Sequence, residues 1–186
     1  KDAQKAYFGG QIDIWQCSDA AGVDGISGNV DLDWFYLDAL NGVCQGEDGN
    51  WYYYVNGEVD TTFTGLAQNQ NGWWYVRNGM VDFSYYGVEQ NGNGWWRIEA
   101  GRVNFDFNGF AENRNGWWYL EGGKVQLDRT EVIQGTVDGE NGWWYVKDGK
   151  VTYTNAVAQN RNGWWYIENG KVNFSHYGVE QNSTGW

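Results

Sequence analysis

The sequence predicts an all-β fold, an elongated β-solenoid of stacked β-hairpin repeats of about 22 residues. Three observations predict it: a motif that recurs at a nearly fixed spacing, a composition rich in aromatic rings, and regularly placed glycine turns. The motif is Asn-Gly-Trp-Trp, which occurs at residues 71–74, 93–96, 115–118, 141–144 and 162–165. A fixed period of this length indicates a repeat array in which each unit stacks only on its neighbours.

The first tryptophan of each unit sets the period. It stands at positions 51, 73, 95, 117, 143, 164 and 186, so the steps are 22, 22, 22, 26, 21 and 22 residues. Trp51-Tyr52 is a degenerate copy of the pair. The long step holds an insertion around residues 129–139, and we expect that unit to bulge or to change the local superhelical step.

Composition supports the same fold and restricts the partners. The 186 residues include 14 Trp, 13 Tyr and 8 Phe, and each buried ring removes roughly 150–250 Å² from water, so small units can be stable with few aliphatic residues. The net charge of −12 argues against nucleic acid as a partner, because phosphate binding needs a basic face. The same charge repels polyanions, so we expect a neutral or cationic ligand. No apolar run approaches the roughly 18 residues of a membrane-spanning helix.

Each unit is expected to form a hairpin. In the unit of residues 73–94, a run of strand-forming residues from Trp73 to Val76 and the alternating Val81 to Ser84 flank Asn78-Gly79. This dipeptide predicts a type I′ turn, which needs positive φ at both central residues. The other predicted tips are Asn56-Gly57, Ala100-Gly101, Gly122-Gly123, Asp148-Gly149 and Asn169-Gly170.

Strand parity predicts which side chains face the core. One inward set comes from the first predicted strand: Val76, Ile98, Leu120, Val146 and Ile167. The second tryptophan of each motif shares that parity: Trp74, Trp96, Trp118, Trp144 and Trp165. The second strand adds Val81, Val103, Val125, Val151 and Val172. The first tryptophan and the residue two places later are then expected to face outward.

Residues 1–47 are less regular than the rest. We interpret them as degenerate repeats that form an N-terminal cap, with a small separate domain as the alternative. Residues 48–186 then hold six repeats and the start of a seventh. Cys17 and Cys44 both precede the first clear repeat. A disulfide between them is the prediction for a secreted protein, and two free thiols are the alternative.

The pattern Gly-Trp-Trp-Tyr-Val-x-x-Gly-Lys-Val-x-Phe, found at residues 142–153 with Tyr153 in the last place, resembles the cell-wall-binding repeats of Gram-positive surface proteins. That group includes choline-binding modules, the glucan-binding repeats of glucansucrases and the receptor-binding repeats of clostridial toxins. The resemblance covers about residues 48–186. It implies a solenoid of β-hairpins, an extracellular location on the bacterial surface or after secretion, and non-catalytic binding to wall polymers or host glycans. Together with the acidic charge, the resemblance leads us to expect a neutral or cationic wall or host glycan component as the ligand.

One departure from that family bears on the ligand. In choline-binding repeats a Gly-Trp lies about seven residues ahead of the Trp-Tyr-Tyr strand, and its ring completes the cage around the trimethylammonium group. The matching residues here are mostly aliphatic: Gly65-Leu66, Gly87-Val88, Gly109-Phe110 and Gly178-Val179. Because a cation needs several ring faces around it, we rank a saccharide above a choline-like amine as the ligand.

The predicted ligand-binding residues are the outward pairs, lining shallow grooves between consecutive units: Trp73 with Tyr75, Trp95 with Arg97, Trp117 with Tyr119, Trp143 with Tyr145, and Trp164 with Tyr166. Two other interpretations compete. The next hairpin could cover each first tryptophan and make it inter-repeat core. The chain could also be a structural spacer or a host-protein-binding adhesin without a ligand of its own. Exposure of the first tryptophans discriminates between these interpretations.

We expect no enzyme activity, metal or cofactor. The sequence contains no nucleophile elbow, zinc motif or phosphate loop. The asparagine-rich loops are typical of turns rather than of calcium sites. A hairpin solenoid also lacks a deep cleft in which a glycosidase could raise the pKa of one carboxyl group.

Overall fold

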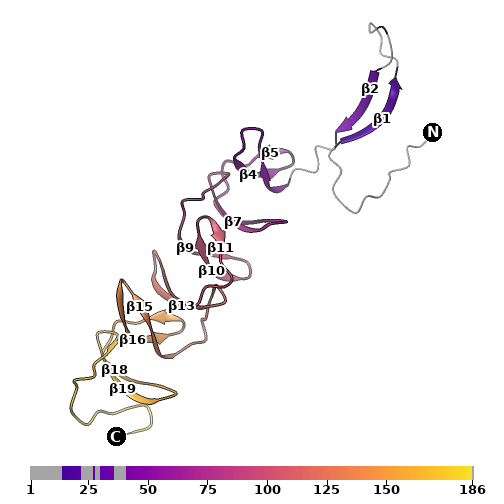
Figure 1. The fold of residues 1–186 in the computed structure, drawn as a ribbon. Helices are drawn as coiled ribbons and strands as arrows, with labels where there is room; N and C mark the ends of the chain where they lie inside the picture. The colour runs from indigo at the N-terminus through magenta and orange to yellow at the C-terminus, as the bar shows by residue number, and fades with distance from the viewer. Residues whose placement is uncertain (1–13, 22–26, 28–29, 36–40, 186) are drawn as a thin grey trace.

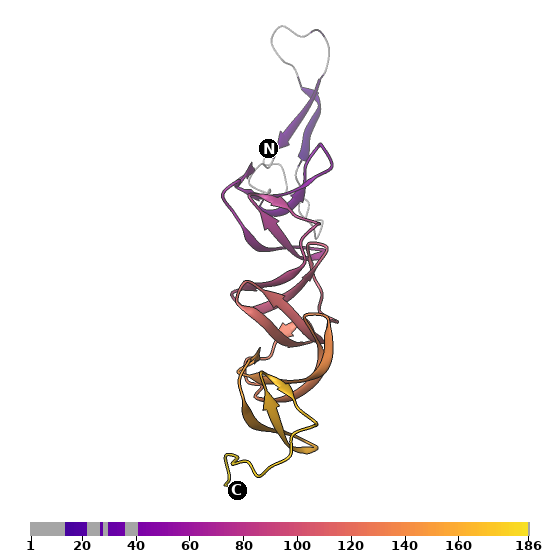
Figure 2. The same cartoon turned by 90° about the vertical axis from the view of Figure 1, so that its left-hand side faces the viewer.

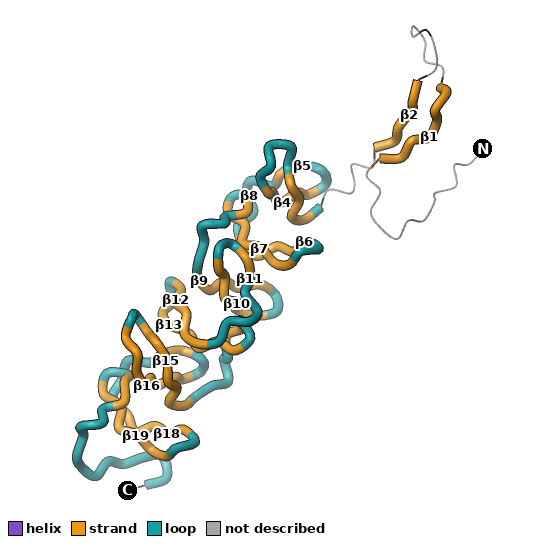
Figure 3. The backbone as a smooth tube through the Cα atoms, viewed as in Figure 1, coloured by secondary structure: helices purple, strands orange, loops and turns teal. Residues whose placement is uncertain are grey.

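The structure is a computed structural model that describes residues 14–21, 27, 30–35 and 41–185. In this part of the chain there are twenty strands and no helix (Figure 3), which confirms the all-β prediction. Strands β3 to β20 belong to one elongated array of stacked hairpins (Figure 1), and the view turned by 90° shows the same narrow shape (Figure 2). No helix of the described residues is long and apolar enough to cross a membrane.

Each unit of the array has three strands: two of four to eight residues that pair as a hairpin, and a two-residue third strand that pairs with the second. In order, the units are β3 (Gly42–Gln45), β4 (Trp51–Val55), β5 (Glu58–Val59); β6 (Gly65–Asn69), β7 (Gly72–Arg77), β8 (Met80–Val81); β9 (Gly87–Asn91), β10 (Gly94–Glu99), β11 (Arg102–Val103); β12 (Gly109–Asn113), β13 (Gly116–Glu121), β14 (Lys124–Val125); β15 (Glu131–Val137), β16 (Glu140–Lys147), β17 (Lys150–Val151); and β18 (Ala156–Asn160), β19 (Gly163–Glu168), β20 (Lys171–Val172). We refer to these as units one to six.

The first strand of each unit is absent from the sequence prediction. Segments such as Gly65–Asn69 contain few aromatic or β-branched residues, so their composition is typical of a loop. They become strands because the tryptophan-rich strand beside them supplies hydrogen-bonding partners, as where Leu66 pairs with Tyr75. In unit one this strand begins at Gly42 and pairs with β4, so the unit starts before residue 48.

The six predicted hairpin tips are confirmed. Both central residues have positive φ at every tip, for example 50° at Asn78 and 80° at Gly79, as a type I′ turn requires. Ala100 adopts φ of 47° despite its Cβ atom. The turn glycines also lie against the preceding unit: a Cβ atom on Gly101 would come within 2.5 Å of the Asp82 carbonyl oxygen.

The insertion in unit five produces no β-bulge, and the alternative, a change in the local superhelical step, stays a prediction. β15 and β16 are seven and eight residues long and pair in continuous register up to Val137 and Glu140. Between those two residues, Asp138 and Gly139 have φ of 50° and 76°, so they form a further turn with positive φ at both residues. The added residues therefore lengthen one hairpin and project its tip.

The apolar core consists of five small clusters, each shared by two consecutive units. The predicted core residues on the second strands are all 0% exposed: Val76, Ile98, Leu120, Val146 and Ile167. The predicted third-strand valines are buried as well, at 3–7% exposure. Each cluster joins these residues to the first-strand side chain and first tryptophan of the unit before, as where Phe110 and Trp117 pack on Val146. Stacking between neighbours thus completes every core, as expected for a repeat array.

Two recurring contacts hold neighbouring units in register. From unit one to unit five, the backbone N–H two residues after the first tryptophan donates to the carbonyl oxygen of the turn glycine in the next unit, as from Tyr75 to Gly101 at 2.7 Å. A cation of the next unit also lies over each second tryptophan from unit two to unit five. Its distance from the ring centroid is 5.4 Å for Arg102 on Trp74, 5.4 Å for Lys124 on Trp96, 5.6 Å for Lys150 on Trp118 and 5.2 Å for Lys171 on Trp144.

Ahead of the array, β1 (Ile14–Ala21) and β2 (Val30–Phe35) pair as an antiparallel two-stranded sheet with irregular register. The interpretation of residues 1–47 as a cap of degenerate repeats stays a prediction. The Cys17 side chain lies outside the described residues, so the predicted disulfide to Cys44 stays a prediction too.

Candidate functional site

The first tryptophans are largely covered by the next unit. Trp73, Trp95, Trp117 and Trp143 are half-buried and pack against the core cluster that the following unit completes. Trp95, for example, stacks on Trp118 of the next unit with ring centroids 6.2 Å apart. Trp164 is 39% exposed, because it lies in the last unit and no described unit packs beyond it.

The sequence predicts that the second tryptophan of each pair is less exposed than the first, and this difference in exposure is clear in two units only. Trp144 is 5% exposed while Trp143 is half-buried, and Trp165 is half-buried while Trp164 is exposed. In the other motifs both rings are half-buried. Parity separates two faces of one strand, but here the second face is covered by the neighbouring hairpin.

The residue two places after the first tryptophan is also less exposed than predicted. Tyr75 is only 6% exposed and stacks on Tyr85 at 3.9 Å. The same contact joins residues ten positions apart in other units, as between Tyr166 and His176 at 3.7 Å. The assignment of Tyr75 to an outer face was therefore wrong. Arg97, Tyr119, Tyr145 and Tyr166 are half-buried.

Asparagine side chains orient the second tryptophans of four motifs, whereas the indole N–H of Trp144 donates to the Gly135 carbonyl. The Trp74 indole N–H donates to the Asn69 side-chain oxygen at 2.9 Å, and that oxygen also accepts the Asn71 backbone N–H. The amide nitrogen of Asn69 donates to the Val43 carbonyl of the preceding unit at 3.2 Å. One asparagine thus fixes a tight turn, a ring and the spacing between units.

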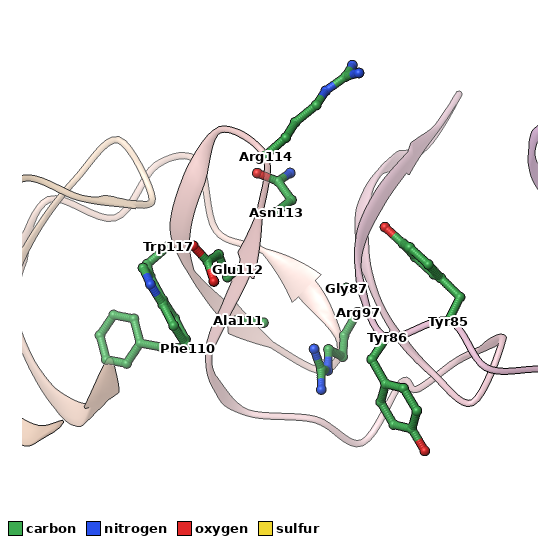
Figure 4. Close-up of a pocket in the computed structure, with 10 residues that line it drawn as sticks. All are labelled: Tyr85, Tyr86, Gly87, Arg97, Phe110, Ala111, Glu112, Asn113, Arg114 and Trp117. Carbon is green, nitrogen blue, oxygen red and sulfur yellow. The ribbon is translucent and has the colours of Figure 1, made fainter. Parts of the chain in front are cut away.

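A groove of about 520 Å³ lies between units three and four; we name it the Arg97 groove. Figure 4 shows Phe110 and Trp117 on one side and Arg97 and Tyr86 on the other. Glu112 lies beside Trp117, its cross-strand partner. The remaining lining residues are Tyr85, Gly87, Ala111, Asn113 and Arg114. The groove combines aromatic faces with charged and amide groups, as expected for a site that stacks on a ligand ring and orients its polar atoms.

A second groove of about 390 Å³ lies where units four, five and six meet; we name it the Tyr119 groove. Its Tyr119, Val132, Gln134 and Trp143 occupy the positions that Arg97, Phe110, Glu112 and Trp117 hold in the first groove. The other lining residues are Arg129, Glu131, Ile133, Asn160, Arg161 and Asn162. The same four positions therefore line a groove one unit along the array, whereas the turn asparagine and arginine come from the tryptophan's own unit in the first groove and from the following unit in the second.

A family model for the choline-binding repeat matches six stretches of the chain: residues 41–60, 62–82, 84–104, 106–126, 134–152 and 153–173. These stretches cover well over half of the sequence and coincide with the six structural units. The chain belongs to the choline-binding repeat family. Comparison with curated proteins finds no match.

The choline-binding repeats of this chain combine their side chains differently from the sequence prediction. The prediction placed grooves between consecutive units and paired wall residues taken from one unit, such as Trp117 with Tyr119. The structure instead brings Arg97 together with Trp117, and Tyr119 together with Trp143. Neither groove contains the other predicted binding residues: Trp73, Tyr75, Trp95, Tyr145, Trp164 and Tyr166.

Sequence reasoning missed the groove residues on the first strands, such as Phe110 and Glu112. It also missed those in the turns between first and second strands, such as Arg114 and Arg161. One signal was present. Phe110 occupies the position where choline-binding repeats carry the additional tryptophan. It is the only aromatic residue among the four matching residues given above, the others being Leu66, Val88 and Val179. It lies 7% exposed against the groove.

The ionisable groups of the two choline-binding repeat grooves differ. In the Tyr119 groove, burial and a hydrogen bond to Glu121 raise the pKa of Tyr119 to about 12. Arg129 is held by both oxygens of Glu121 at 3.0 and 3.1 Å and by Glu131 at 3.1 Å, and the bond to Glu121 raises the pKa of Arg129. In the first groove, Arg97 binds a single carboxylate, Glu99, through Nε.

Proposed function

We propose that this chain is a non-catalytic binding module of a surface or secreted protein, which attaches to a cell-wall polymer or glycan through grooves between its repeats. The observation that carries the proposal is the recurrence of one groove architecture at neighbouring positions along the array. In each copy a first tryptophan, Trp117 or Trp143, faces a side chain of the preceding unit.

The chemistry of these grooves favours a sugar ring. The apolar face of a pyranose stacks on a half-buried indole, and nearby amide and carboxylate groups such as Gln134 and Glu112 can bind its hydroxyl groups. A quaternary amine would need ring faces on several sides. In the first groove one of those sides is occupied by the Arg97 guanidinium. We therefore place a saccharide before choline, which stays the alternative ligand.

The second candidate function is a spacer or host-protein adhesin with no glycan ligand. The stacking of Trp95 on Trp118 favours it, because rings packed in this way serve the array itself. The two functions can occur in one chain, since only some first tryptophans line a groove.

The deciding experiment compares the full chain with one double variant and one single variant. W117F/W143F alters both grooves while keeping an aromatic ring, and W95F changes a first tryptophan that lines neither groove. Binding would be measured by co-sedimentation with purified cell walls and insoluble glucan, and by fluorescence titration with choline. Far-ultraviolet circular dichroism and thermal unfolding would verify that each variant is folded.

We expect the parent chain and W95F to sediment with wall or glucan and W117F/W143F to remain largely in solution. Tight, stoichiometric choline binding would reverse the ranking of ligands. Failure of the parent chain to bind any wall, glucan or choline preparation would support the spacer instead.

A further inference from the structure

Arginine is concentrated at the two grooves. The chain has only six arginines, against 24 acidic residues, and four of the six line these grooves: Arg97 and Arg114 in one, Arg129 and Arg161 in the other. In this acidic chain each groove lining holds two arginines and one carboxylate, which is Glu112 in the first groove and Glu131 in the second.

Arg97 stands where every other unit has tyrosine: Tyr53, Tyr75, Tyr119, Tyr145 and Tyr166. Arg97 retains the packing contact that three of these tyrosines make with an aromatic ring ten positions later. Its guanidinium lies 5.0 Å from the centroid of the Phe107 ring, in place of the ring stack between Tyr75 and Tyr85. Packing alone is thus satisfied by tyrosine, and the charge of Arg97 is an addition to the common architecture.

The Arg97 guanidinium retains hydrogen-bonding capacity. Its Nε donates to Glu99 at 3.1 Å, and its two terminal nitrogens donate to no other described residue. In Figure 4 it lies between Tyr86 and the pair of Phe110 and Trp117. A ligand that stacks on Trp117 would therefore have an acidic substituent within reach of a planar two-nitrogen donor, the geometry that binds carboxylates in bidentate fashion.

The Tyr119 groove lacks this capacity. A phenol replaces the guanidinium of Arg97, and Arg129 is already bound by Glu121 and Glu131. Arg114 and Arg161 lie in the turns between the first and second strands of their units. They form no ion pair within the described part of the chain, and they contribute positive potential at the rims of the grooves. The difference in acid-binding capacity between the grooves therefore rests on Arg97.

We propose that the Arg97 groove binds a carboxylated sugar, with the pyranose ring on Trp117 and its carboxylate on Arg97. This inference rests on the proposed glycan-binding function and names the ligand class of one of its sites. A hexuronate and a sugar with a lactyl ether, as in muramic acid, present the same carboxylate chemistry. A cationic ligand is disfavoured here, because it would have to approach the guanidinium.

The test uses the full chain and tryptophan fluorescence or calorimetry. The probes are a hexuronate oligosaccharide, the same oligosaccharide with its carboxyl groups reduced to alcohols, and the disaccharide of N-acetylglucosamine and N-acetylmuramic acid. The central variant is R97Y, which inserts the residue of the other five units and so preserves the stack. The control is R77Q, which removes an arginine that lines neither groove.

We expect R97Y to weaken binding of at least one acidic probe about tenfold and to leave binding of the reduced oligosaccharide unchanged. R77Q should bind like the parent chain, and added salt should weaken only the acidic probes. The better of the two acidic probes identifies the source of the carboxylate.

Two outcomes would overturn the inference. If the reduced oligosaccharide binds as tightly as the acidic one, or if R97Y binds the acidic probes like the parent chain, Arg97 does not select the ligand. The proposed function survives either result as long as W117F/W143F still abolishes binding to wall or glucan. If the parent chain binds no saccharide and no wall preparation, the proposed function fails together with the inference.

Discussion

At the scale of single residues, two separate factors favour glycine in the turns: a positive φ angle and close contact with the preceding unit. Positive φ alone disfavours a side chain, as at Gly139, where φ is 76° and a Cβ atom would meet no neighbouring group within 4 Å. At Gly149 φ is 77°, and a Cβ atom would also lie 2.6 Å from the Gln126 carbonyl oxygen of the preceding unit. The two glycines belong to the same unit, so they separate local strain from contact between units.

Alanine at these two glycines should therefore have unequal effects on stability. We expect G139A to lower the free energy of unfolding by about 1 kcal/mol, the cost of left-handed backbone for a residue with a Cβ atom. G149A should cost about 1–3 kcal/mol more, since it also forces the units apart. Urea denaturation followed by tryptophan fluorescence measures both, and equal costs would show that the close approach to Gln126 relaxes freely.

At the scale of the hairpin, both faces of the tryptophan-rich strand are packed. Residues of one parity fill the core cluster completed by the preceding unit, and the first tryptophan fills the cluster shared with the following unit. Period-two reasoning assumes one wet face, so it found the aliphatic core residues and overestimated the exposure of Tyr75 and of the first tryptophans. The long β15–β16 hairpin follows the same rule, with Val137 at 0% exposure.

Replacing a buried tryptophan by alanine should therefore destabilise the protein more than replacing an exposed one. Trp144 is 5% exposed, donates to the Gly135 carbonyl at 3.2 Å and packs with Val137 and Val146, so W144A should cost about 3–5 kcal/mol. W164A removes a ring that is 39% exposed, and we expect less than half of that cost. Denaturant midpoints measure this difference in stability, provided that the two variants unfold with similar m-values. A loss of stability in W164A as large as in W144A would mean that Trp164 is covered in solution.

At the scale of the whole molecule, there is no central core in the array. Five clusters, each spanning two units, link the described repeats from Val43 to Val172. Stability is then a sum of nearest-neighbour terms, and binding sites repeat with the units that form them. Because neighbouring grooves differ in their hydrogen-bonding groups, with Arg97 in one and Tyr119 at the same position in the other, a heterogeneous polymer can contact both while a short oligosaccharide occupies one.

A long ligand should consequently bind more tightly than a short one. We expect a wall polymer or glucan chain that spans both grooves to bind at least about tenfold more tightly than its tetrasaccharide, through a raised effective concentration at the second groove. W143F should reduce this ratio, whereas W95F should preserve it. Calorimetric titration with ligands of graded length measures the ratio, and affinity that does not depend on length would argue against simultaneous use of both grooves.

The sequence by itself determined the period, the six turn positions and the aliphatic core, because each depends on contacts within a few residues. Asn-Gly and its equivalents impose the turn, and alternation places Val76 or Ile98 inside. Only the tertiary structure decided which side chains share a groove, as with Arg97 and Trp117. That pairing depends on how one hairpin is rotated and seated on the next, and this geometry is fixed by packing between units rather than by spacing along the chain.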